Sequence, residues 1–362
     1  MTLEPDPRTS ALAQRLALPI ICAPMFIVSY PALVLAQCKA GVVGSFPALN
    51  ARPKELLEEW LVDMGSELDQ YRRAHPERRV APFAVNQIVH PTNDRLAHDF
   101  ALCVKHRVEI VITSGLPAAE LVQEVHAYGG LVIHAVTNLR HAERALREGV
   151  DGLSLVAVGA GGHAGTLSPF ALVSEARRLC AGPLALAGAI SDGAQVLAAL
   201  AAGADFAYVG TRFIATTEAN ATQEYKRMVL ASSGGEIVYT PFFTGLPGNY
   251  LGRRIAELGL DPAQLGQTDR TRLNVKAWKD VWTAGHGVGA ITDLPSVADL
   301  VGRMAADYAR AAGRVAVLAR GLPAAHTVAA PEDAFPPPRE GVASHDAGPQ
   351  SQPAPSAPNP CT

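Results

Sequence analysis

The stretch LVIHAVTNLRHAERALREGVDGLSLVAVG, residues 131–159, contains two short apolar runs on either side of a more polar segment. LVIHAVT (131–137) and GLSLVAVG (152–159) have the composition of buried β-strands. The segment LRHAERALREG between them has the mixed spacing of charged and apolar residues that is typical of an amphipathic helix. A strand, a helix and a second strand in close succession predict a parallel βαβ unit.

The same pattern continues in both directions along the chain. Six further apolar runs have strand character: ICAPMF (21–26), GVVGSF (41–46), FAVNQIV (83–89), IVITSG (110–115), LALAGAI (184–190) and FAYVGT (206–211). Helical stretches such as AAELVQEVHAYG, PFALVSEARRLC and GAQVLAALAAG lie between them. Eight strand–helix units predict an α/β protein with a closed (β/α)8 TIM barrel. An open doubly wound sheet is built from the same units and is the alternative fold.

Some segments do not follow this alternation. The polar stretch 50–79 lengthens the connection after the second strand, and residues 212–283 are too long for a barrel loop. We therefore expect a small, mostly helical inserted domain at 212–283, in which EANATQEYKRMV is a helix and GGEIVYTPFFTGLPGNYLGRRIAELG is irregular before a final helix. The barrel then comprises 1–211 and 284–320. Residues 321–362 are rich in Pro, Ser and Ala and are expected to be a disordered tail.

Composition excludes several classes of protein. A formal net charge of −3 over 362 residues offers no electrostatic case for binding nucleic acid or an anionic membrane. The five cysteines show no CxxC spacing, so we expect neither a disulfide framework nor a metal site, and a reduced, cytoplasmic setting fits best. The first ten residues, MTLEPDPRTS, are unlike a signal peptide. The uncharged stretch between Arg15 and Lys39 is interrupted by three prolines, which argues against a membrane span.

Small residues gather where the last strands end. The seventh strand runs into GAISDG (188–193) and the eighth into Gly210 and Thr211, each next to the start of a helix. Backbone amides, a hydroxyl and helix dipoles at this edge of a barrel suit a bound phosphate. The alternative is that these residues only make tight turns between strand and helix. The glycine-rich stretch VGAGGHAG (158–165), at the end of the sixth strand, would add a third backbone wall to the same pocket.

His163 is the ionisable residue of this glycine-rich stretch. An imidazole that titrates near neutrality is the usual group for moving a proton at pH 7, and His163 follows a strand end that faces the predicted anion pocket. A hydrogen-bonded structural histidine is the alternative. Gly159, Gly161 and Ala164 also satisfy a loose dinucleotide-binding pattern, but no acidic residue stands at the end of the next strand, which argues against a Rossmann site.

Several motifs together resemble the nitronate monooxygenase family. They are APMF, VNQ, AGGHAGTLSP, GAIS, VGTRF and WKDVWTAGHGVGAI, in order and at matching spacing between about Leu18 and Arg314. The resemblance implies a flavoprotein monooxygenase that carries FMN in a barrel with an inserted substrate domain. It implies oxidation of nitronates or nitroalkanes by O2 to a carbonyl compound and nitrite. The alternatives are an FMN-dependent NAD(P)H reductase acting on an enoyl thioester or quinone, and a flavin-binding protein without enzymatic activity. We expect a small-molecule substrate and O2 as partners, and a homodimer is compatible with the sequence.

The resemblance also implies roles for individual residues. His163 matches the family histidine that takes the α-proton of a nitroalkane. The residues that would contact the isoalloxazine or lie beside it are Ala23, Pro24, Met25, Asn86, Gly161, Gly162 and His286. The residues that would hold the phosphate are Ala187, Gly188, Ala189, Gly210 and Thr211.

The chain departs from the family pattern at four of these strand ends and turns. Val156 stands where many relatives have Gln or Glu, and Gly159 where they have Glu. Ala135 replaces a frequent lysine near the phosphate, and His286 replaces a frequent glutamine. We expect His286 either to act as a second titratable group at the flavin edge or to replace the hydrogen bond of that glutamine.

Overall fold

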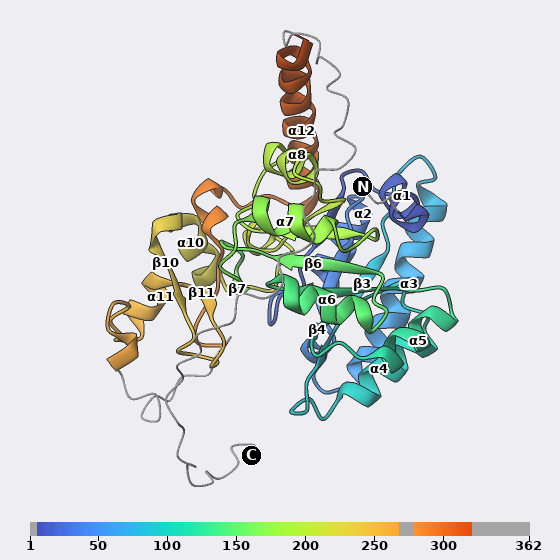
Figure 1. Ribbon diagram of the computed structural model, residues 1–362, viewed down its shortest axis with the longest axis horizontal. Coiled ribbons are helices and arrows are strands. Elements are labelled where there is room, and N and C mark those ends of the chain that lie inside the picture. The colour runs from blue at the N-terminus through green and yellow to red at the C-terminus, as the bar shows by residue number, and fades with distance from the viewer. Residues whose placement is uncertain (1–5, 268–278, 321–362) are drawn as a thin grey trace, which may run out of the picture. The chain divides into compact units, whose positions relative to one another are not determined.

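The computed structural model describes residues 6–267 and 279–320 and contains a ring of eight parallel strands (Figure 1). The strands neighbour one another in the order β1-β9-β8-β6-β5-β4-β3-β2. Each overlaps one of the eight predicted runs, with the bounds β1 (Ile20–Cys22), β2 (Gly44–Pro47), β3 (Phe83–Val89), β4 (Ile110–Gly115), β5 (Leu131–Val136), β6 (Gly152–Val156), β8 (Leu184–Ala187) and β9 (Phe206–Val209).

The first and last strands of this order meet and close the ring. Ile21 in β1 forms a parallel bridge with Val43, next to the start of β2. The Cys22 N–H donates to the Val43 carbonyl at 2.8 Å, and the Val43 N–H donates to the Ile20 carbonyl at 3.0 Å. The fold is therefore a (β/α)8 TIM barrel, as predicted, and the open doubly wound sheet is excluded.

Helices alternate with these strands along the chain. Their bounds are α2 (Pro31–Lys39), α3 (Leu56–Ala74), α4 (Leu96–Lys105), α5 (Ala119–Ala127), α6 (Leu139–Arg147), α7 (Pro169–Arg177), α8 (Gly193–Ala201), α9 (Thr211–Ile214) and α12 (Val297–Arg320). The polar stretch after the second strand is largely α3, a helix of 19 residues. It buries Leu57, Leu61, Met64 and Leu68, whose spacing of three to four residues places them on one face.

The amino-terminal ends of the strands are closed by α1 (Pro7–Gln14). Leu12 and Leu16 are buried together with Ile21, Ile110 and Phe206 in the cluster of apolar side chains that fills the barrel. A packed barrel interior of this kind is typical of the fold. In Figure 1, α1 lies on the opposite side of the barrel from the carboxyl end of β6, so one end of the barrel is covered and the other remains for loops.

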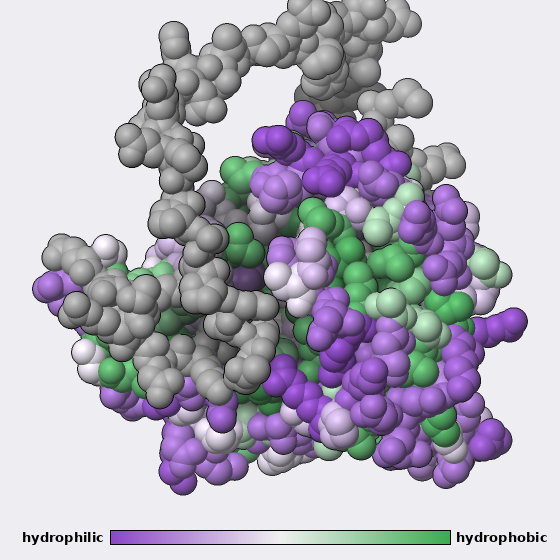
Figure 2. Space-filling model, turned by 90° about the horizontal axis from the view of Figure 1, so that it is seen from below, coloured by the Kyte–Doolittle hydropathy of each residue, from purple (hydrophilic) through white to green (hydrophobic). Residues whose placement is uncertain are grey.

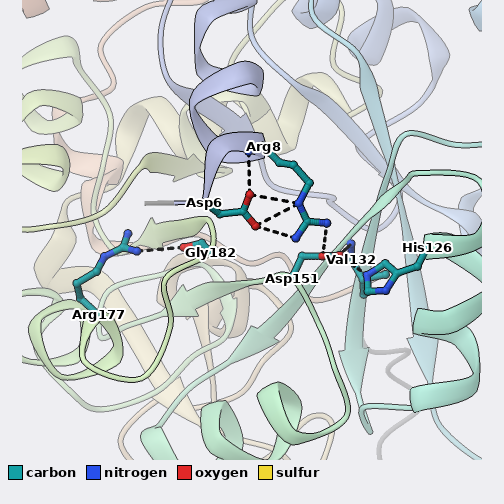
Figure 3. A network of polar contacts seen from close by, with 7 residues as sticks. All are labelled: Asp6, Arg8, His126, Val132, Asp151, Arg177 and Gly182. Carbon is teal, nitrogen blue, oxygen red and sulfur yellow. Dashed lines mark hydrogen bonds and ion pairs between the residues drawn. The ribbon is translucent and has the colours of Figure 1, made fainter. Parts of the chain in front are cut away.

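Charged groups gather at the covered end (Figure 3). Asp151 directly precedes β6 and is almost fully buried, with 3% of its side chain exposed. Its carboxylate lies 2.6 Å from Arg8, accepts the Val132 N–H at 2.7 Å and contacts His126 Nε2 at 2.8 Å. Arg8 also contacts Asp6, at 2.7 Å. The carboxylate therefore links α1, β5 and α5 at the base of the barrel.

A second, smaller sheet lies beyond the carboxyl end of β6. It consists of β7 (Gly162–His163), β10 (Ile237–Thr240) and β11 (Gly248–Leu251), antiparallel and in the order β10-β11-β7. The stretch that was expected to be irregular is thus mainly a β-hairpin. Its strands contain Val238, Tyr239 and Tyr250, residue types that favour strands, and Tyr250 is buried against Phe243.

The remaining elements are short. They are α10 (Gln223–Ala231), α11 (Gly252–Glu257) and the 3-10 turns η1 (Ala48–Asn50), η2 (Gly234–Glu236), η3 (Leu265–Gln267) and η5 (His286–Ala290). Contacts group the described residues 6–267 and 279–317 into one compact unit. The division of this unit into a barrel and an inserted domain at 212–283 stays a prediction. The expected tail at 321–362 lies outside the described residues.

The structure bears on two expectations from the sequence, one about a membrane span and one about the cysteines. Within residues 6–267 and 279–320, no helix combines the length and the apolar character needed to cross a bilayer. On the face drawn in Figure 2, hydrophobic groups gather in a band that is bordered by hydrophilic groups. Cys22, Cys38, Cys103 and Cys180 are buried free thiols. Burial raises the pKa of all four, which keeps them protonated and unreactive at neutral pH.

Candidate active site

A cavity of about 790 Å³ lies at the carboxyl ends of the barrel strands. Its volume falls within the range of cofactor and ligand sites. Its walls come from the segments that follow β1, β3, β6, β8 and β9 and from the segment between α10 and α12. All but one of the predicted site residues line it: Ala23, Pro24, Met25, Asn86, Gly161, Gly162, His163, Ala187, Gly188, Ala189, Gly210 and Thr211.

Backbone and small side chains form the part of the cavity wall next to β1. The Ala23 N–H donates to the Val209 carbonyl at 2.9 Å, which continues the β1–β9 ladder into the loop. A Cβ atom added to Gly210 would lie 3.3 Å from the Ala23 Cβ and 3.7 Å from the Met25 sulfur. The glycine therefore keeps this part of the wall flat and open, as an aromatic ring system would require.

Asn86 supplies a fixed polar group to the cavity wall at β3. It stands on β3 with 7% of its surface exposed. Its amide nitrogen donates to the Ile112 carbonyl at 3.1 Å and contacts Ser114 Oγ at 3.4 Å. Both bonds orient the side chain, so that its Oδ1 is the remaining polar atom at the wall and can accept a ligand N–H.

The glycine-rich loop packs against a second glycine-rich segment. The His286 N–H donates to the Gly159 carbonyl at 2.9 Å. A Cβ atom added to Gly285 would lie 2.3 Å from that carbonyl, and one added to Gly161 would lie 3.0 Å from the Gly285 nitrogen. The close approach of two backbones therefore requires glycine here, and the same loop exposes Gly161 and Gly162 to the cavity.

The predicted phosphate region has two different helix starts. At α8, the Asp192 carboxylate already accepts the Gln195 N–H at 2.8 Å, so this helix end is capped by an anion of the chain itself. At α9, Gly210 is the N-cap and has no side-chain cap. Thr211 Oγ1 accepts the Gly285 N–H at 2.9 Å and keeps its own proton for a ligand. The α9 side is thus the better place for an anion.

The turn after β8 contains a strained residue. Ala189 has a φ of 56°, in the left-handed region that non-glycine residues rarely adopt, and it follows Gly188 with a φ of 142°. Both residues line the cavity. Backbone strain of this kind gathers at binding sites, where the surrounding structure holds it in place.

His163 stands in β7 and is held from the hairpin. Its backbone pairs with Gly248 in β11, and its Nε2 lies 2.8 Å from Thr244 Oγ1, in the loop between β10 and β11. The ring reaches solvent at the cavity, yet the surrounding protein atoms desolvate it and lower the pKa of its imidazole. His163 is therefore a neutral imidazole at pH 7.

The hydrogen bonds of Thr244 indicate which ring nitrogen of His163 carries the proton. The Leu246 N–H donates to Thr244 Oγ1 at 3.3 Å, and the Thr244 hydroxyl donates to the Leu246 carbonyl at 3.0 Å. When the hydroxyl gives its one proton to the Leu246 carbonyl, it acts as an acceptor toward His163. This assignment places the ring proton on Nε2 and the basic lone pair on Nδ1.

His286 is the predicted residue that the cavity lining does not include. Its side chain lies against the outer side of the glycine-rich loop, where a Cβ atom added to Gly159 would be 3.4 Å from the His286 Nδ1. A different histidine, His90, lines the cavity from the loop after β3. Its Nδ1 accepts the Thr92 N–H at 3.2 Å, so its ring proton is on Nε2. His90 also follows a strand end, the signal that singled out His163, and it could have been found in this way.

The cavity carries little formal charge. Its described lining residues include no Asp, Glu, Lys or Arg. Two of the four positions that depart from the family pattern, Ala135 and Val156, add apolar surface to it. Tyr225 also lines the cavity, and burial raises the pKa of its hydroxyl to about 12. Among the residues that the structure describes, no group of three His, Cys, Asp or Glu side chains could hold a metal ion. A bound anion would thus be held by backbone and hydroxyl dipoles.

Comparisons with known proteins agree with this geometry. The sequence profile of the nitronate monooxygenase family matches residues 9–307. A nitronate monooxygenase of Paraburkholderia phytofirmans is 29% identical over 352 residues, which cover 86% of this chain and 90% of that protein. A carboxyl-CoA dehydrogenase of Rhodococcus jostii is 25% identical over 233 residues, which cover 64% of this chain and 62% of the relative.

Solved structures show the same fold. FabK from Thermotoga maritima has a TM-score of 0.69 at 24% identity and covers 86% of this chain and 98% of its own. A nitroalkane oxidase from Streptomyces ansochromogenes has a TM-score of 0.67 at 25% identity and covers 84% of this chain and 99% of its own. The family match spans most of the described barrel and all of the residues that line the cavity. The chain therefore belongs to the nitronate monooxygenase family, and it is an oxidoreductase of this flavin-dependent family.

Proposed function

We propose that this protein is an FMN-dependent nitronate monooxygenase, which oxidises nitronates or nitroalkanes with O2 to a carbonyl compound and nitrite. The observation that carries the proposal is the neutral imidazole of His163, held by Thr244 in the wall of an uncharged cavity. A group of this kind can remove a weakly acidic C–H proton at neutral pH.

The cavity fits a flavin mononucleotide. The flat wall at Ala23 and Gly210 suits one face of the isoalloxazine, and Asn86 Oδ1 suits a ring N–H. The Thr211 hydroxyl and the uncapped start of α9 suit the phosphate. When bound, a flavin supplies a two-electron acceptor that O2 can reoxidise.

His163 would act on a neutral nitroalkane as the general base. The proton moves from the α-carbon to Nδ1, and the electron pair of the broken C–H bond remains on the substrate, which becomes a nitronate. The lowered pKa keeps Nδ1 unprotonated before this step. The Thr244 oxygen would accept from Nε2–H before and after the transfer and would keep the ring in one orientation.

The principal alternative is an FMN-dependent NAD(P)H reductase that acts on an enoyl thioester or quinone. Such a site commonly pairs the phosphates of NAD(P)H or CoA with Lys or Arg side chains. The described lining residues of this cavity include neither, which favours a small substrate. The likeness to FabK concerns the fold.

Oxygen consumption separates the two functions. We expect the purified protein, loaded with FMN, to consume O2 and release nitrite when propyl nitronate is added without any nicotinamide nucleotide. The contradicting outcome has two parts: no O2 uptake on propyl nitronate alone, and activity only when NADH or NADPH is oxidised. This outcome would support the reductase.

A further inference from the structure

Ile27 has a backbone conformation that isoleucine rarely adopts. It lies in the loop between β1 and α2, and its φ is 60°. For a β-branched residue, this left-handed conformation is a genuine outlier, whereas glycine would adopt it without strain. The other described non-glycine residues with positive φ are Ala189, which lines the cavity, and Arg107, which follows the end of α4. Left-handed residues are common after helix ends, so Ile27 is the outlier that needs an explanation.

Two asparagines hold Ile27 from both sides. The Ile27 N–H donates to Asn50 Oδ1 at 3.0 Å, and Asn220 Nδ2 donates to the Ile27 carbonyl at 3.0 Å. The buried Asn50 also donates through Nδ2 to the carbonyls of Met25, at 3.1 Å, and Ser29, at 2.8 Å. Both donors and the acceptor of the Asn50 side chain are therefore used on this loop, which maintains the strained conformation.

The strained residue stands in the cavity wall. Ile27 is partly buried and lines the cavity together with the neighbouring Phe26. It stands beyond Ala23 and Met25 along the loop that leaves β1, and its bond to Asn220 ties it to the segment that follows α9. Ile27 thus belongs to the cavity-lining stretch 23–28, and its backbone is fixed to the segment between α9 and α10.

We propose that Ile27, held in its left-handed conformation by Asn50 and Asn220, is the residue that limits the size of the substrate's alkyl chain. The inference deepens the proposed function and rests on it for the identity of the substrate, a small alkyl nitronate. A glycine would adopt this conformation without strain, whereas the chain has a branched side chain here, at a position in the cavity wall. Asn220 is then a positioning residue that acts through Ile27.

The first test measures selectivity for chain length. We would compare kcat/KM for ethyl nitronate and hexyl nitronate in the wild-type holoenzyme and in Ile27→Val, Ile27→Ala and Ile27→Gly. Removal of a methylene-sized contact changes discrimination by roughly 10- to 200-fold in apolar pockets. We expect the ratio of hexyl to ethyl nitronate to rise along this series, by at least about tenfold at Ile27→Ala. A ratio that stays constant in all three variants would overturn the proposal.

The second test measures the strain itself. At an ordinary position glycine lowers the melting temperature more than alanine does, because it is more flexible in the unfolded chain. At Ile27 we expect the reverse order, with Ile27→Gly melting above Ile27→Ala. Leu49 is a matched control, since it lines the same cavity from the 3-10 turn η1, and there Leu49→Gly should melt below Leu49→Ala. A lower melting temperature for Ile27→Gly than for Ile27→Ala would contradict the role of strain.

The third test asks whether the clamp acts through Ile27. Asn220→Ala removes the bond to the Ile27 carbonyl and should raise the hexyl-to-ethyl ratio in the same direction as Ile27→Ala. In the Ile27→Gly background, the same change should leave the ratio unaltered, because the side chain that it positions is gone. Independent, additive effects of the two substitutions would remove Asn220 from the proposal.

A binding measurement separates this inference from the proposed function. Propanamide and heptanamide are unreactive planar analogues with the same two alkyl chains, and their Kd can be followed by flavin absorbance. If the wild type oxidises no nitronate, the proposed function fails, yet a Kd ratio that shifts in the Ile27 variants would still support the size limit. If the variants lose FMN affinity with no change in either ratio, Ile27 contacts the cofactor and the size limit is refuted.

Discussion

The two ends of the barrel differ sharply in charge. At the amino-terminal end, Glu109, Asp151 and Asp205 each stand immediately before a strand and pair with Arg15, Arg8 and Arg177. At the carboxyl end, the cavity presents backbone, hydroxyls and imidazoles, and no Asp, Glu, Lys or Arg among its described lining residues. The charged end joins helices to strands and stabilises the fold, whereas the uncharged end leaves room for a ligand and keeps His163 neutral.

The same residue type behaves differently at the two ends. His126, at the base, lies 2.8 Å from the buried Asp151, in a structural link between α5 and the start of β6. His163, in the cavity wall, has a hydroxyl as its partner and a lowered pKa. A desolvated site with a neutral partner favours the free base of an imidazole. Position in the barrel therefore separates a structural histidine from a candidate base.

The largest expected effect comes from His163→Ala. Loss of the general base should reduce turnover of neutral 1-nitropropane by about 10²- to 10⁴-fold. Propyl nitronate has already lost the proton, so its oxidation should fall much less, and bound FMN should remain. Steady-state oxygen consumption with both substrates measures this difference. His126→Ala serves as the matched histidine at the other end of the barrel and should leave both activities unchanged at a temperature at which it is folded.

Equal losses on nitroalkane and nitronate in His163→Ala would exclude the base role and leave His163 as a residue that positions the nitro group. Unchanged activity on both substrates would make His163 a structural residue like His126 and would remove the contrast between the two ends.

Asp151→Ala should have the largest effect on stability. It would leave the buried Val132 N–H without its acceptor and Arg8 and His126 without their carboxylate, at a cost of about 2–4 kcal/mol in the free energy of unfolding. Urea denaturation measures this loss, and kcat of the folded fraction should not change. Glu109→Ala is the control, since its pair with Arg15 is exposed on both sides and should contribute no more than about 0.5 kcal/mol. Similar losses in both variants would contradict the structural role given to the buried carboxylate.

Thr244→Val should have a smaller effect that is confined to proton transfer. It removes the oxygen that holds Nε2 of His163, and one hydrogen bond corresponds to about a tenfold change in rate. We expect kcat on 1-nitropropane to fall by about that factor, with oxidation of propyl nitronate little affected. Thr244→Ser retains the hydroxyl and should recover the wild-type rate. If the serine variant is as impaired as the valine variant, the methyl group and not the hydrogen bond matters.

The smallest effect concerns pH. A base works in its deprotonated form, so turnover of a neutral nitroalkane should be full above the pKa of His163 and should fall as the pH drops through it. Because desolvation lowers the pKa of His163 below its ordinary 6.5, the acid limb should lie below pH 6.5. Thr244→Val should move this limb further down, by less than about one pH unit, since a hydrogen-bond acceptor stabilises the imidazolium. A limb above pH 7 would contradict the environment described for the imidazole.

Local sequence patterns were sufficient for the barrel but not for the contacts around His163. The apolar runs and the helices between them predict the eight strands because these patterns are local. The hairpin at Ile237–Thr240 and Gly248–Leu251 was expected to be irregular, since its strands are short and their pairing with β7 links distant segments. The bond from His163 to Thr244, 81 residues apart, depends on that register and could not be predicted.

Helix capping and side-chain direction could not be predicted from the sequence either. The pattern at GAISDG was compatible with an anion site at the start of α8, yet Asp192 caps that helix and leaves the start of α9 as the better site. The resemblance predicts His286 at the flavin edge, and only the packing of its side chain against Gly159 shows that it is outside the cavity lining. The strain at Ile27 comes from its positive φ. The residue types in APMFIVSY do not predict a positive φ at this position.

The identity of the flavin tests the central claim most directly, namely that the uncharged carboxyl end of the barrel is a mononucleotide site. The protein should be purified without added cofactor, denatured by heat, and the released flavin separated by chromatography and quantified against the chain. We predict FMN, approaching one molecule per chain, with the phosphate held at Gly210 and Thr211. Release of FAD, or a colourless protein that added FMN does not saturate, would contradict the account.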